Sequence, residues 1–423
     1  MPSAPTESAL VVRPNGPLKG SVPISGAKNS VLKLMAAALL APGTHTVHNV
    51  PDITDVAVMS QLLDHMGVVV RREGSTLTLI VGEELIAEAP YELVAKMRAS
   101  IAVLGPLLAR CGTASVAMPG GDDFGPRPID MHLRGLELLG AEFTSSRGII
   151  EGRCDGLLGA NIVLEFPSVG ATENLLMAAV RAKGETTIDN AAREPEIVDL
   201  AAFLSQMGAQ VTGAGSSTIS VEGTERLSPA EFTVMPDRIE AATFLAATGV
   251  AGGEVTLTGA RPDHLDLLCQ KFGDMGIKTS PDPDGLWVFM NERLHSVDVS
   301  TLPYPGIATD FKPLIVAMLT VGDDVGIVTE NLFTGRFRYI DELIRMGADI
   351  RTEGHHAVVR GVDRLSGAPV RAHDIRAGAA LVVAALGAEG ETTIVGAEHL
   401  DRGYERFVDK LVALGADIER VSV

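Results

Sequence analysis

Two kinds of apolar segment alternate along the chain in a fixed order. One is apolar at nearly every position over a helical length, as in NSVLKLMAAALLAPG and AGAALVVAALGAEG, which predicts helices buried on all sides. The other is a short run rich in β-branched residues, such as THTVHNV or ETTIVGA, and is typical of a strand. An amphipathic helix and two more strand-like runs follow. The pattern therefore predicts a repeat of helix, strand, helix, strand and strand.

Two series of glycines indicate that this repeat occurs six times. The amphipathic helix ends in Met-Gly or Leu-Gly, with successive spacings of 73, 68, 68, 71 and 68 residues, at Gly67, Gly140, Gly208, Gly276, Gly347 and Gly415. A glycine there adopts the left-handed conformation that closes a helix. The second series follows each buried helix, at Gly43, Gly112, Gly184, Gly253, Gly322 and Gly390. A shared period of about 70 residues identifies internal repeats.

The repeats predict two domains. One repeat cannot enclose an all-apolar helix, so repeats must pack with these helices together, and we expect two groups of three. The N-terminal hairpin LVVRPNGPLKGSVPIS has no helix of its own, and the last repeat, ending in DIERVSV, lacks a closing strand. The two ends should therefore meet. We expect an α/β fold with a continuous domain over 22–234, a discontinuous domain over 1–21 and 235–423, and a cleft between them.

Composition and charge exclude several classes of protein. With 46% apolar and 21% charged residues the chain should be globular throughout. A net charge of −19 disfavours nucleic acid and anionic membranes as partners. Cys111, Cys154 and Cys269 form no C-x-x-C pair, which argues against a zinc site or a disulfide framework. The chain start lacks a signal-peptide pattern and no apolar run reaches the roughly 20 residues of a membrane span, so we expect a cytoplasmic protein.

Polar and charged residues interrupt the apolar pattern where the buried helices begin. They are Lys28, Asn29, Arg98, Ser168, Asp237, Arg238, Asp310, Asp374 and Arg376. An Asp or Ser at such a place is most simply an N-cap. A basic residue opposes the helix dipole and needs an anion nearby. The basic positions therefore indicate either a phosphate or carboxylate site, or solvated surface charge.

Arginines also recur in the loop after the first strand of a repeat. Arg127, Arg193, Arg261, Arg336 and Arg402 fall there, and guanidinium groups bind carboxylate and phosphate at two points. The alternative is a set of salt bridges with Glu194, Asp263 or Asp401. The loop 119–128, with three glycines, three prolines and adjacent Asp122 and Asp123, is typical of a lid over a site or of a plain surface loop.

Several segments resemble one family. GAKNSVLKL, PGGDDFGPRPIDMHLRGLELLGA, SVGATEN, NAAREPEIVD, TDFKP, DIRAGAALV and HLDRGYE are similar, in order, to the UDP-N-acetylglucosamine 1-carboxyvinyltransferase (enolpyruvyl transferase) family. The resemblance implies two inside-out α/β barrels, each of three repeats with pseudo-threefold symmetry. It implies transfer of the enolpyruvyl group of phosphoenolpyruvate to the 3-hydroxyl of UDP-N-acetylglucosamine with release of phosphate, the first committed step of peptidoglycan precursor synthesis. It implies no metal or organic cofactor, and a monomer or weak homo-oligomer.

The resemblance also implies roles for residues that match the family motifs. Phosphoenolpyruvate would be bound by Lys28, Arg98, Arg127, Arg336, Arg376 and Arg402. The UDP sugar would be bound by Asn29, Arg98, Arg127, Pro128, Ile129, Asp130, His132, Ser168, Val169, Gly170, Asp310 and Phe333. The catalytic groups would be Asp122, Asp310, Lys28 and Arg402, with Asp310 taking the proton of the attacking hydroxyl. Glu194, Asp237, Arg238 and Asp374 would support the site.

Some positions depart from the family pattern. Many members have a cysteine, the target of fosfomycin, where this chain has Asp122, so the resemblance implies an enzyme insensitive to fosfomycin. Because an aspartic acid ordinarily titrates at about 3.9, proton donation by Asp122 at neutral pH requires desolvation, and activity should fall at alkaline pH. Departures at Asp123, Phe124, Thr334 and Ala308 leave a second possibility, a paralogue that acts on another uridine nucleotide in secondary metabolism. A shikimate 3-phosphate acceptor fits less well, since that sister family begins its first helix with a G-S-K-S type sequence.

Overall fold

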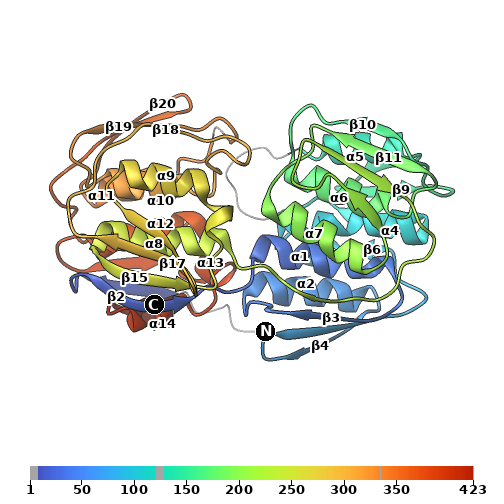
Figure 1. The fold of residues 1–423 in the computed structure, drawn as a ribbon, viewed down its shortest axis with the longest axis horizontal. Helices are drawn as coiled ribbons and strands as arrows, with labels where there is room; N and C mark the ends of the chain where they lie inside the picture. Colours follow the sequence, from blue (N-terminus) through green and yellow to red (C-terminus); the bar gives the residue numbers. More distant parts are fainter. Residues whose placement is uncertain (1–7, 121–127, 334, 423) are drawn as a thin grey trace. The chain divides into compact units, whose positions relative to one another are not determined.

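The computed structural model describes residues 8–120, 128–333 and 335–422, and they divide into two compact units. The continuous unit comprises 26–120 and 128–235, and the split unit comprises 8–25 and 236–422. In Figure 1 the continuous unit is coloured from blue to green. The split unit consists of dark-blue strands from the start of the chain and of residues coloured from yellow-green to red. The predicted site residues Asp122 and Arg127, and also Asp123, Phe124 and Thr334, lie outside the described residues.

The continuous unit contains helices and strands in the predicted alternation. Its helices are α1 (Lys28–Ala37), α2 (Thr54–His65), α3 (Tyr91–Val94), α4 (Leu104–Cys111), α5 (Asp130–Leu138), α6 (Val169–Ala179) and α7 (Pro195–Gln206), with 3₁₀ turns η1 (Ala38–Leu40) and η2 (Arg98–Val103). Its strands are β3 (Gly43–His48), β4 (Val69–Glu73), β5 (Thr76–Val81), β6 (Glu88–Ala89), β7 (Thr113–Ala117), β8 (Glu142–Ser146), β9 (Ile149–Arg153), β10 (Asn161–Val163), β11 (Glu185–Asp189), β12 (Gln210–Thr212), β13 (Thr218–Glu222) and β14 (Glu231–Thr233).

The split unit repeats the same alternation. Its helices are α8 (Arg238–Ala251), α9 (Asp266–Asp274), α10 (Lys312–Leu319), α11 (Tyr339–Arg345), α12 (Ile375–Leu386), α13 (Glu398–Asp401) and α14 (Phe407–Ala413), with the 3₁₀ turn η3 (Pro262–His264). Its strands are β1 (Ser8–Arg13), β2 (Leu18–Pro23), β15 (Gly253–Thr258), β16 (Lys278–Asp282), β17 (Gly285–Met290), β18 (Val299–Ser300), β19 (Val325–Thr329), β20 (Asp349–Glu353), β21 (His356–Arg360), β22 (Pro369–Arg371), β23 (Thr392–Val395) and β24 (Asp417–Ser422).

Within the described ranges, each unit holds three four-stranded sheets of one design. The orders are β14-β3-β5-β4, β6-β7-β9-β8 and β10-β11-β13-β12 in the continuous unit, and β16-β17-β15-β2, β18-β19-β21-β20 and β22-β23-β1-β24 in the split unit. In every sheet one edge strand pairs parallel with its neighbour, and the other pairings are antiparallel. The six predicted repeats are thus six copies of one sheet with its helices.

The N-terminal strands do not form the predicted hairpin. β1 pairs antiparallel with both β23 and β24, whereas β2 pairs parallel with β15 in a different sheet. The hairpin prediction was wrong because each of the two strands completes the sheet of a different repeat. β1 supplies the strand that the last repeat lacks, and β2 supplies a parallel edge strand. In the continuous unit, β14 pairs with β3 in the same way and closes the sheet of the first repeat.

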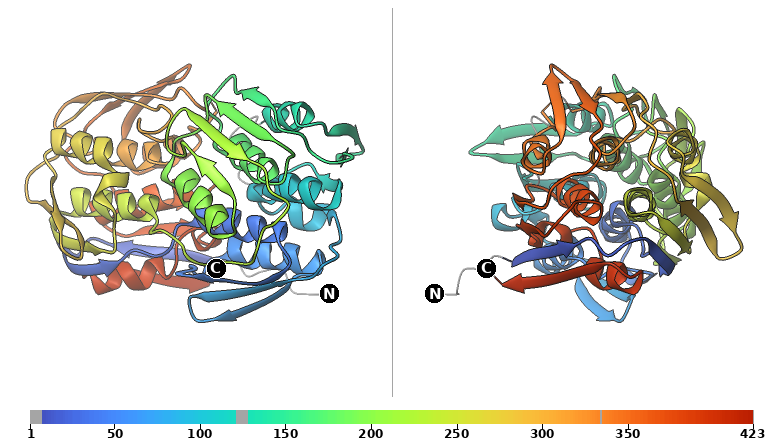
Figure 2. Two further views of the ribbon diagram at one scale, coloured as in Figure 1. Left: turned by 45° about the vertical axis from the view of Figure 1, so that its right-hand side comes forward. Right: turned by 90° about the vertical axis from the view of Figure 1, so that its left-hand side faces the viewer.

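The all-apolar helices lie inside the sheets. Every residue of α12 is buried, and so are twelve of the fourteen residues of α8. These two helices and α10 contact one another. The right-hand view of Figure 2 looks along the helices of the split unit and shows its strands at the periphery. The sequence prediction of helices buried on all sides is confirmed.

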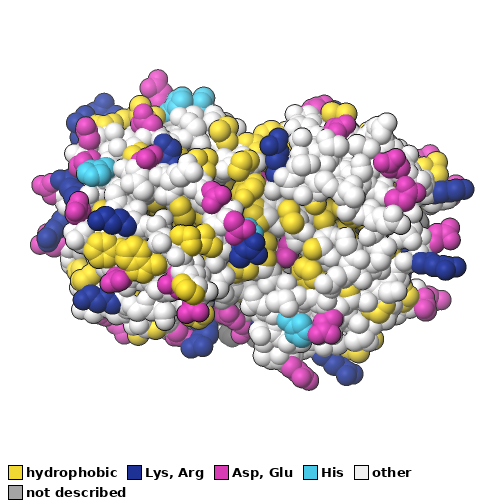
Figure 3. Space-filling view, in the orientation of Figure 1, with side chains coloured by type: hydrophobic (Ala, Val, Ile, Leu, Met, Phe, Trp, Pro, Cys, Tyr) yellow, Lys and Arg dark blue, Asp and Glu magenta, His cyan; other side chains and the backbone are white. Residues whose placement is uncertain are grey.

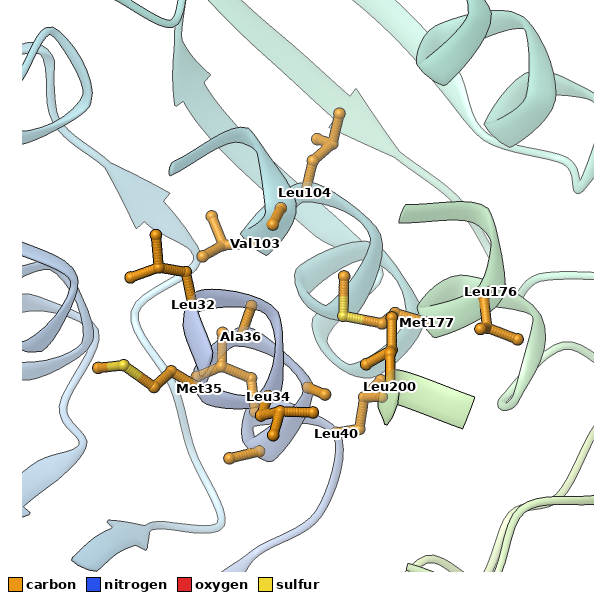
Figure 4. Packing of buried hydrophobic residues seen from close by; sticks show 14 of the residues in the cluster. Leu32, Leu34, Met35, Ala36, Leu40, Val103, Leu104, Leu176, Met177 and Leu200 are labelled. Carbon is orange, nitrogen blue, oxygen red and sulfur yellow. The ribbon is translucent and has the colours of Figure 1, made fainter. Parts of the chain in front are cut away.

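The corresponding helices α1, α4 and α6 make the core of the continuous unit. Leu34 and Met35 of α1 belong to one buried cluster with Leu104 of α4 and Met177 of α6, which are labelled in Figure 4. The helices approach closely where side chains are small: a Cβ added to Gly105 would lie 2.4 Å from the backbone oxygen of Asn174. The glycines of the Met-Gly and Leu-Gly series have φ between +90° and +103°, which confirms that they close the amphipathic helices.

We predict that Gly105→Ala destabilises the protein and that Gly273→Ala does not. Both glycines lie in helices, but a Cβ at Gly273 in α9 meets nothing within 4 Å. Overpacking typically costs about 1–3 kcal/mol, whereas Gly to Ala in an open helical position gains about 0.5–1 kcal/mol. The free energy of unfolding in urea measures both effects. Equal stabilities of the two variants would contradict the close contact of α4 with α6.

Candidate functional site

The predicted site residues form two groups, one at the N-terminal ends of the central helices of each unit. In the continuous unit α1 begins at Lys28, η2 at Arg98 and α5 at Asp130, and Ser168 is the N-cap of α6. The Ser168 hydroxyl accepts a hydrogen bond from Ala171 N at 3.3 Å, which confirms the N-cap interpretation. Val169 and Gly170 open α6, while the exposed Pro128 and the buried Ile129 directly precede α5.

The basic residues of α1 are balanced by carboxylates within the unit. Lys28 Nζ lies 2.8 Å from Asp55 Oδ2, in the first turn of α2. One turn along α1, Lys33 Nζ lies 2.9 Å from Glu173 Oε2 of α6 and donates to the carbonyl of Asn29. The protein itself therefore supplies an anion for Lys28, and a substrate anion would have to share that lysine with Asp55.

A buried amide that the sequence analysis missed connects three of these helices. Asn174 Oδ1 accepts from Gly105 N at 2.8 Å, while its Nδ2 donates to Ile101 O at 3.0 Å. The Asn174 side chain thus replaces the helical hydrogen bond that Gly105 N would otherwise donate to Ile101 O. At this point η2 continues into α4. Nδ2 also lies 3.0 Å from His132 Nδ1. The one signal in the sequence was the run of three polar residues in the otherwise apolar segment ATENLLMAAV.

This network fixes the chemical state of His132. Because Asn174 presents its NH₂ group, His132 Nδ1 accepts and the neutral ring carries its proton on Nε2. Burial lowers the pKa of His132 to about 4, helped by Arg98 and Lys33 and opposed by Asp130. A Cβ at Gly170 would lie only 3.2 Å from Nε2. His132 is therefore a neutral hydrogen-bond donor at the start of α6.

Glu194, expected to support the site, belongs to an acidic cluster in the same unit. Burial raises the pKa of Glu173 to about 7; Lys33 opposes the rise, and Glu196 and Glu194 add to it. Glu194 occupies the N-cap position of α7, followed by Pro195 as the first helical residue. Glu194 thus acts electrostatically on Glu173, whose ion pair with Lys33 joins α6 to α1.

In the split unit two aspartates cap the central helices. Asp237 Oδ1 accepts from Ile239 N at 2.7 Å and Glu240 N at 3.2 Å. Asp374 Oδ1 accepts from Arg376 N at 2.8 Å and Ala377 N at 2.9 Å. The N-cap interpretation is confirmed for both. Asp310 precedes α10 by two residues and caps nothing by its side chain among the described contacts.

Three arginines surround Asp310. Arg336 Nη2 lies 2.7 Å from Asp310 Oδ1, and Arg376 Nε lies 3.9 Å from the same oxygen. Arg238, Arg336 and Arg376 are only 6%, 4% and 5% exposed. The guanidinium groups of Arg238 and Arg376 lie 5.4 Å from the ring centres of Tyr304 and Tyr404, respectively. Buried guanidinium groups near helix N-termini can bind an anion, and Asp310 is such an anion here.

These arginines set the charge state of Asp310. Burial raises the pKa of Asp310, but Arg336, Arg376 and Arg238 together lower it far more and hold it well below its usual range. Asp310 is therefore ionised, as a proton acceptor must be. Arg336 Nη2 donates to Oδ1 at 2.7 Å, and without that positive neighbour the carboxylate would be a stronger base.

Among the remaining described arginines, the contacts of Arg261 distinguish between the two interpretations. Arg402 follows α13, which contacts α12. Arg261, in contrast, holds Asp263 at 2.9 and 2.7 Å on the surface, so the salt-bridge alternative is correct there. Asp401 pairs with Arg420. Phe333 lies between β19 and α11 and donates its backbone N–H to Glu330 Oε1 at 3.1 Å.

The described residues also limit other kinds of site. Among them no group of three or more His, Cys, Asp or Glu could hold a metal ion. None of their helices is long and apolar enough to cross a membrane. On the face shown in Figure 3, Lys and Arg side chains are interspersed with Asp and Glu and form no continuous basic area.

We predict that His132 makes the protein sensitive to acid. Because the folded pKa of about 4 lies below the unfolded value of about 6.5, only the unfolded chain takes up this proton between those values, and stability is lost as pH falls through them. His132→Gln should therefore flatten the pH dependence of the free energy of unfolding by up to about 3 kcal/mol. His65→Gln, at an exposed position, is the matched control. Parallel curves for wild type and His132→Gln would refute the assignment.

Comparisons with known proteins agree with the resemblance. The EPSP synthase (3-phosphoshikimate 1-carboxyvinyltransferase) family matches residues 12–411. The UDP-N-acetylglucosamine 1-carboxyvinyltransferase of Corynebacterium jeikeium is 49% identical over 98% of this chain and 99% of the relative, and that of Nocardia farcinica is 51% identical over 96% of each. The enolpyruvyl transferase NikO from Streptomyces tendae matches 99% of this chain and 100% of its own with a TM-score of 0.88 at 25% identity. EPSP synthase from Acinetobacter baumannii shares the α/β fold, with a TM-score of 0.77 at 20% identity over 98% of this chain and 100% of that one. The chain belongs to the EPSP synthase family and, within it, groups with the UDP-N-acetylglucosamine 1-carboxyvinyltransferases.

Proposed function

We propose that this enzyme transfers the enolpyruvyl group of phosphoenolpyruvate to the 3-hydroxyl of UDP-N-acetylglucosamine and releases phosphate. The observation that carries the proposal is the 49% and 51% identity, over almost the full length, to relatives named for that activity. The comparisons therefore favour this acceptor over the alternative of another uridine nucleotide. The step would supply peptidoglycan precursors.

The reaction consists of an addition and an elimination. In the addition, C3 of phosphoenolpyruvate gains a proton, C2 becomes electron-poor, and the sugar oxygen bonds to C2 while the hydroxyl proton passes to Asp310. In the elimination, C3 loses a proton, the bond from C2 to the phosphate oxygen breaks, and phosphate leaves. Following the family resemblance, we assign proton donation to Asp122. Positioned acid and base groups commonly contribute about 10²–10⁴-fold each.

The two groups of basic residues supply the electrostatics. We assign the phosphate and carboxylate of phosphoenolpyruvate to Lys28, Arg98, Arg127, Arg336, Arg376 and Arg402. An anion that draws Arg336 away from Asp310 removes the main charge that lowers the pKa of that carboxyl, so Asp310 becomes a stronger base. Binding of phosphoenolpyruvate thus activates the base that the acceptor needs. The UDP sugar is assigned to Asn29, Arg98, Arg127, Pro128, Ile129, Asp130, His132, Ser168, Val169, Gly170, Asp310 and Phe333.

The architecture and location of the enzyme are further parts of the proposal. We propose that each unit is an inside-out α/β barrel, supported by three sheets of one design around three central helices. Unit boundaries after Ser25 and Met235 support two domains close to the expected 22–234 and 1–21 with 235–423. Cys111, Cys154 and Cys269 are free thiols, which fits a cytoplasmic enzyme.

We predict that Asp310→Asn lowers kcat by about 10²–10⁴-fold, because the amide cannot accept the hydroxyl proton. Phosphate release with phosphoenolpyruvate and a panel of uridine nucleotides measures the effect. Asp263→Asn is the matched control, since Asp263 pairs with Arg261 on the surface, and it should leave kcat unchanged. A wild-type kcat in Asp310→Asn would refute the role of Asp310. Phosphate release with a different uridine nucleotide only would replace the proposed acceptor.

We predict that the wild-type enzyme withstands fosfomycin and that Asp122→Cys becomes sensitive. A thiolate attacks electrophiles readily, and a carboxylate at this position would not be alkylated by the drug. The measurement is residual activity after incubation with fosfomycin for increasing times. Time-dependent inactivation of the wild type would contradict the prediction. Asp122→Glu is the control that keeps a carboxylate.

A further inference from the structure

A completely buried ion pair lies beneath the arginine cluster of the split unit. Lys312 and Glu330 are both 0% exposed, and Lys312 Nζ lies 3.0 Å from Glu330 Oε2. Lys312 is the first residue of α10, where a positive charge opposes the helix dipole. Glu330 comes directly after β19. Neither residue can touch a substrate, so whatever they contribute to the reaction passes through their neighbours.

Glu330 accepts hydrogen bonds on both of its oxygens. Oε1 accepts from the Thr301 hydroxyl at 2.8 Å and from the backbone N–H groups of Leu332 and Phe333 at 2.8 and 3.1 Å. Oε2 accepts from the Thr309 hydroxyl at 2.7 Å, beside Lys312. A carboxylate with this many donors is fixed in position.

The Thr309 hydroxyl links the fixed carboxylate of Glu330 to Arg336 in the arginine cluster. Its single proton is donated to Glu330, so its oxygen is left to accept from Arg336 Nη1, which lies at 3.1 Å. The same guanidinium donates from Nη2 to Asp310 Oδ1 at 2.7 Å. Lys312 also donates to the backbone oxygen of Arg336. The side chain and the backbone of Arg336 are therefore both held by the buried pair.

The charges of Glu330 and Lys312 favour the hydrogen-bond directions just described for Thr309. Burial raises the pKa of Glu330, but Lys312 and the hydroxyls of Thr309 and Thr301 lower it to a net value below its ordinary one. Burial lowers the pKa of Lys312 to about 8, with Glu330 opposing the shift. At neutral pH Glu330 is therefore an acceptor only, and since a guanidinium group can only donate, the Thr309 hydroxyl donates to Glu330 and accepts from Arg336.

We propose that Glu330, balanced by Lys312, is a positioning residue that holds Arg336 against Asp310 through the Thr309 hydroxyl. This rests on the proposed function, in which Arg336 binds phosphoenolpyruvate and Asp310 takes the hydroxyl proton. We call the chain of hydrogen bonds from Glu330 through Thr309 to Arg336 the relay. It gives Arg336 one fixed hydrogen bond, to Thr309, and one exchangeable hydrogen bond, to Asp310. An arriving anion then displaces the second while the first keeps the guanidinium in place.

The test compares Thr309→Val with Thr309→Ser. Valine keeps the shape but removes both hydrogen bonds, whereas serine keeps the hydroxyl. We expect Thr309→Val to lower kcat about tenfold, the effect of one hydrogen bond to a charged group, with a smaller change in the KM for the UDP sugar. Thr309→Ser should restore kcat. Thr320→Val is the matched control, because Thr320 is 0% exposed and bonds Ala317 O at the opposite end of α10.

A second pair of variants separates the relay from direct substrate contact by Thr309. Lys312→Met with Glu330→Gln removes both buried charges together, and thermal unfolding checks that the protein folds. If Glu330 acts through Thr309, adding Thr309→Val to this variant costs nothing further, whereas independent effects multiply. Multiplied losses, or equal kcat values for Thr309→Val and Thr309→Ser, would overturn the proposal.

Crystal structures of the Thr309 variants test, without any activity assay, whether Thr309 positions Arg336. The 2.7 Å contact of Arg336 Nη2 with Asp310 Oδ1 should persist in Thr309→Ser and be lost in Thr309→Val. If it persists in both, the relay is refuted. If the wild type releases no phosphate with any uridine nucleotide, the proposed function fails, and the two crystal structures still decide whether Glu330 positions Arg336.

Discussion

The enclosure of helices that are apolar on all sides is the constraint on which the rest of this structure depends. A helix such as α12, buried at every position, has no face that can meet water, so it needs neighbours all round. Three repeats together provide them, each with one sheet and one central helix. The chain must also complete each four-stranded sheet, which is why β1, β2 and β14 pair with strands far from them in the sequence.

Enclosure also determines where the chemistry can occur. A helix that is buried along its sides still exposes unpaired N–H groups at its first turn, and the central helices of one unit bring these ends together. In the split unit this end gathers Asp237, Asp374, Asp310 and the arginines that surround it. Because the arginines there are buried, the charges interact strongly and shift pKa values. The ionised state of Asp310 results from this environment, and the neutral state of His132 results from burial within the continuous unit.

The sequence could predict what a repeat imposes locally. Periodic glycines, helix caps and all-apolar helices recur at fixed spacing, so Gly67, Ser168 and α12 were all foreseen. The N-terminal hairpin was predicted wrongly, because β1 pairs with β23 and β24 and β2 pairs with β15, all of them far away in the sequence. Asn174 and Glu330 were also missed. Each acts on a partner that sequence spacing does not place beside it, Gly105 and Lys312 respectively, and one sequence shows no periodicity for such pairs.

The two lysines that begin central helices illustrate how repeats diverge in function. Lys28 opens α1 and pairs with Asp55 at 2.8 Å, and Lys312 opens α10 and pairs with Glu330 at 3.0 Å. Both oppose the helix dipole, and both are balanced by a carboxylate from a later segment of the same repeat. Lys28 remains 8% exposed, whereas Lys312 is 0% exposed. The same local arrangement therefore leaves one lysine able to reach an anionic substrate. It encloses the other, which can influence the reaction only by holding Arg336 and Asp310 in place.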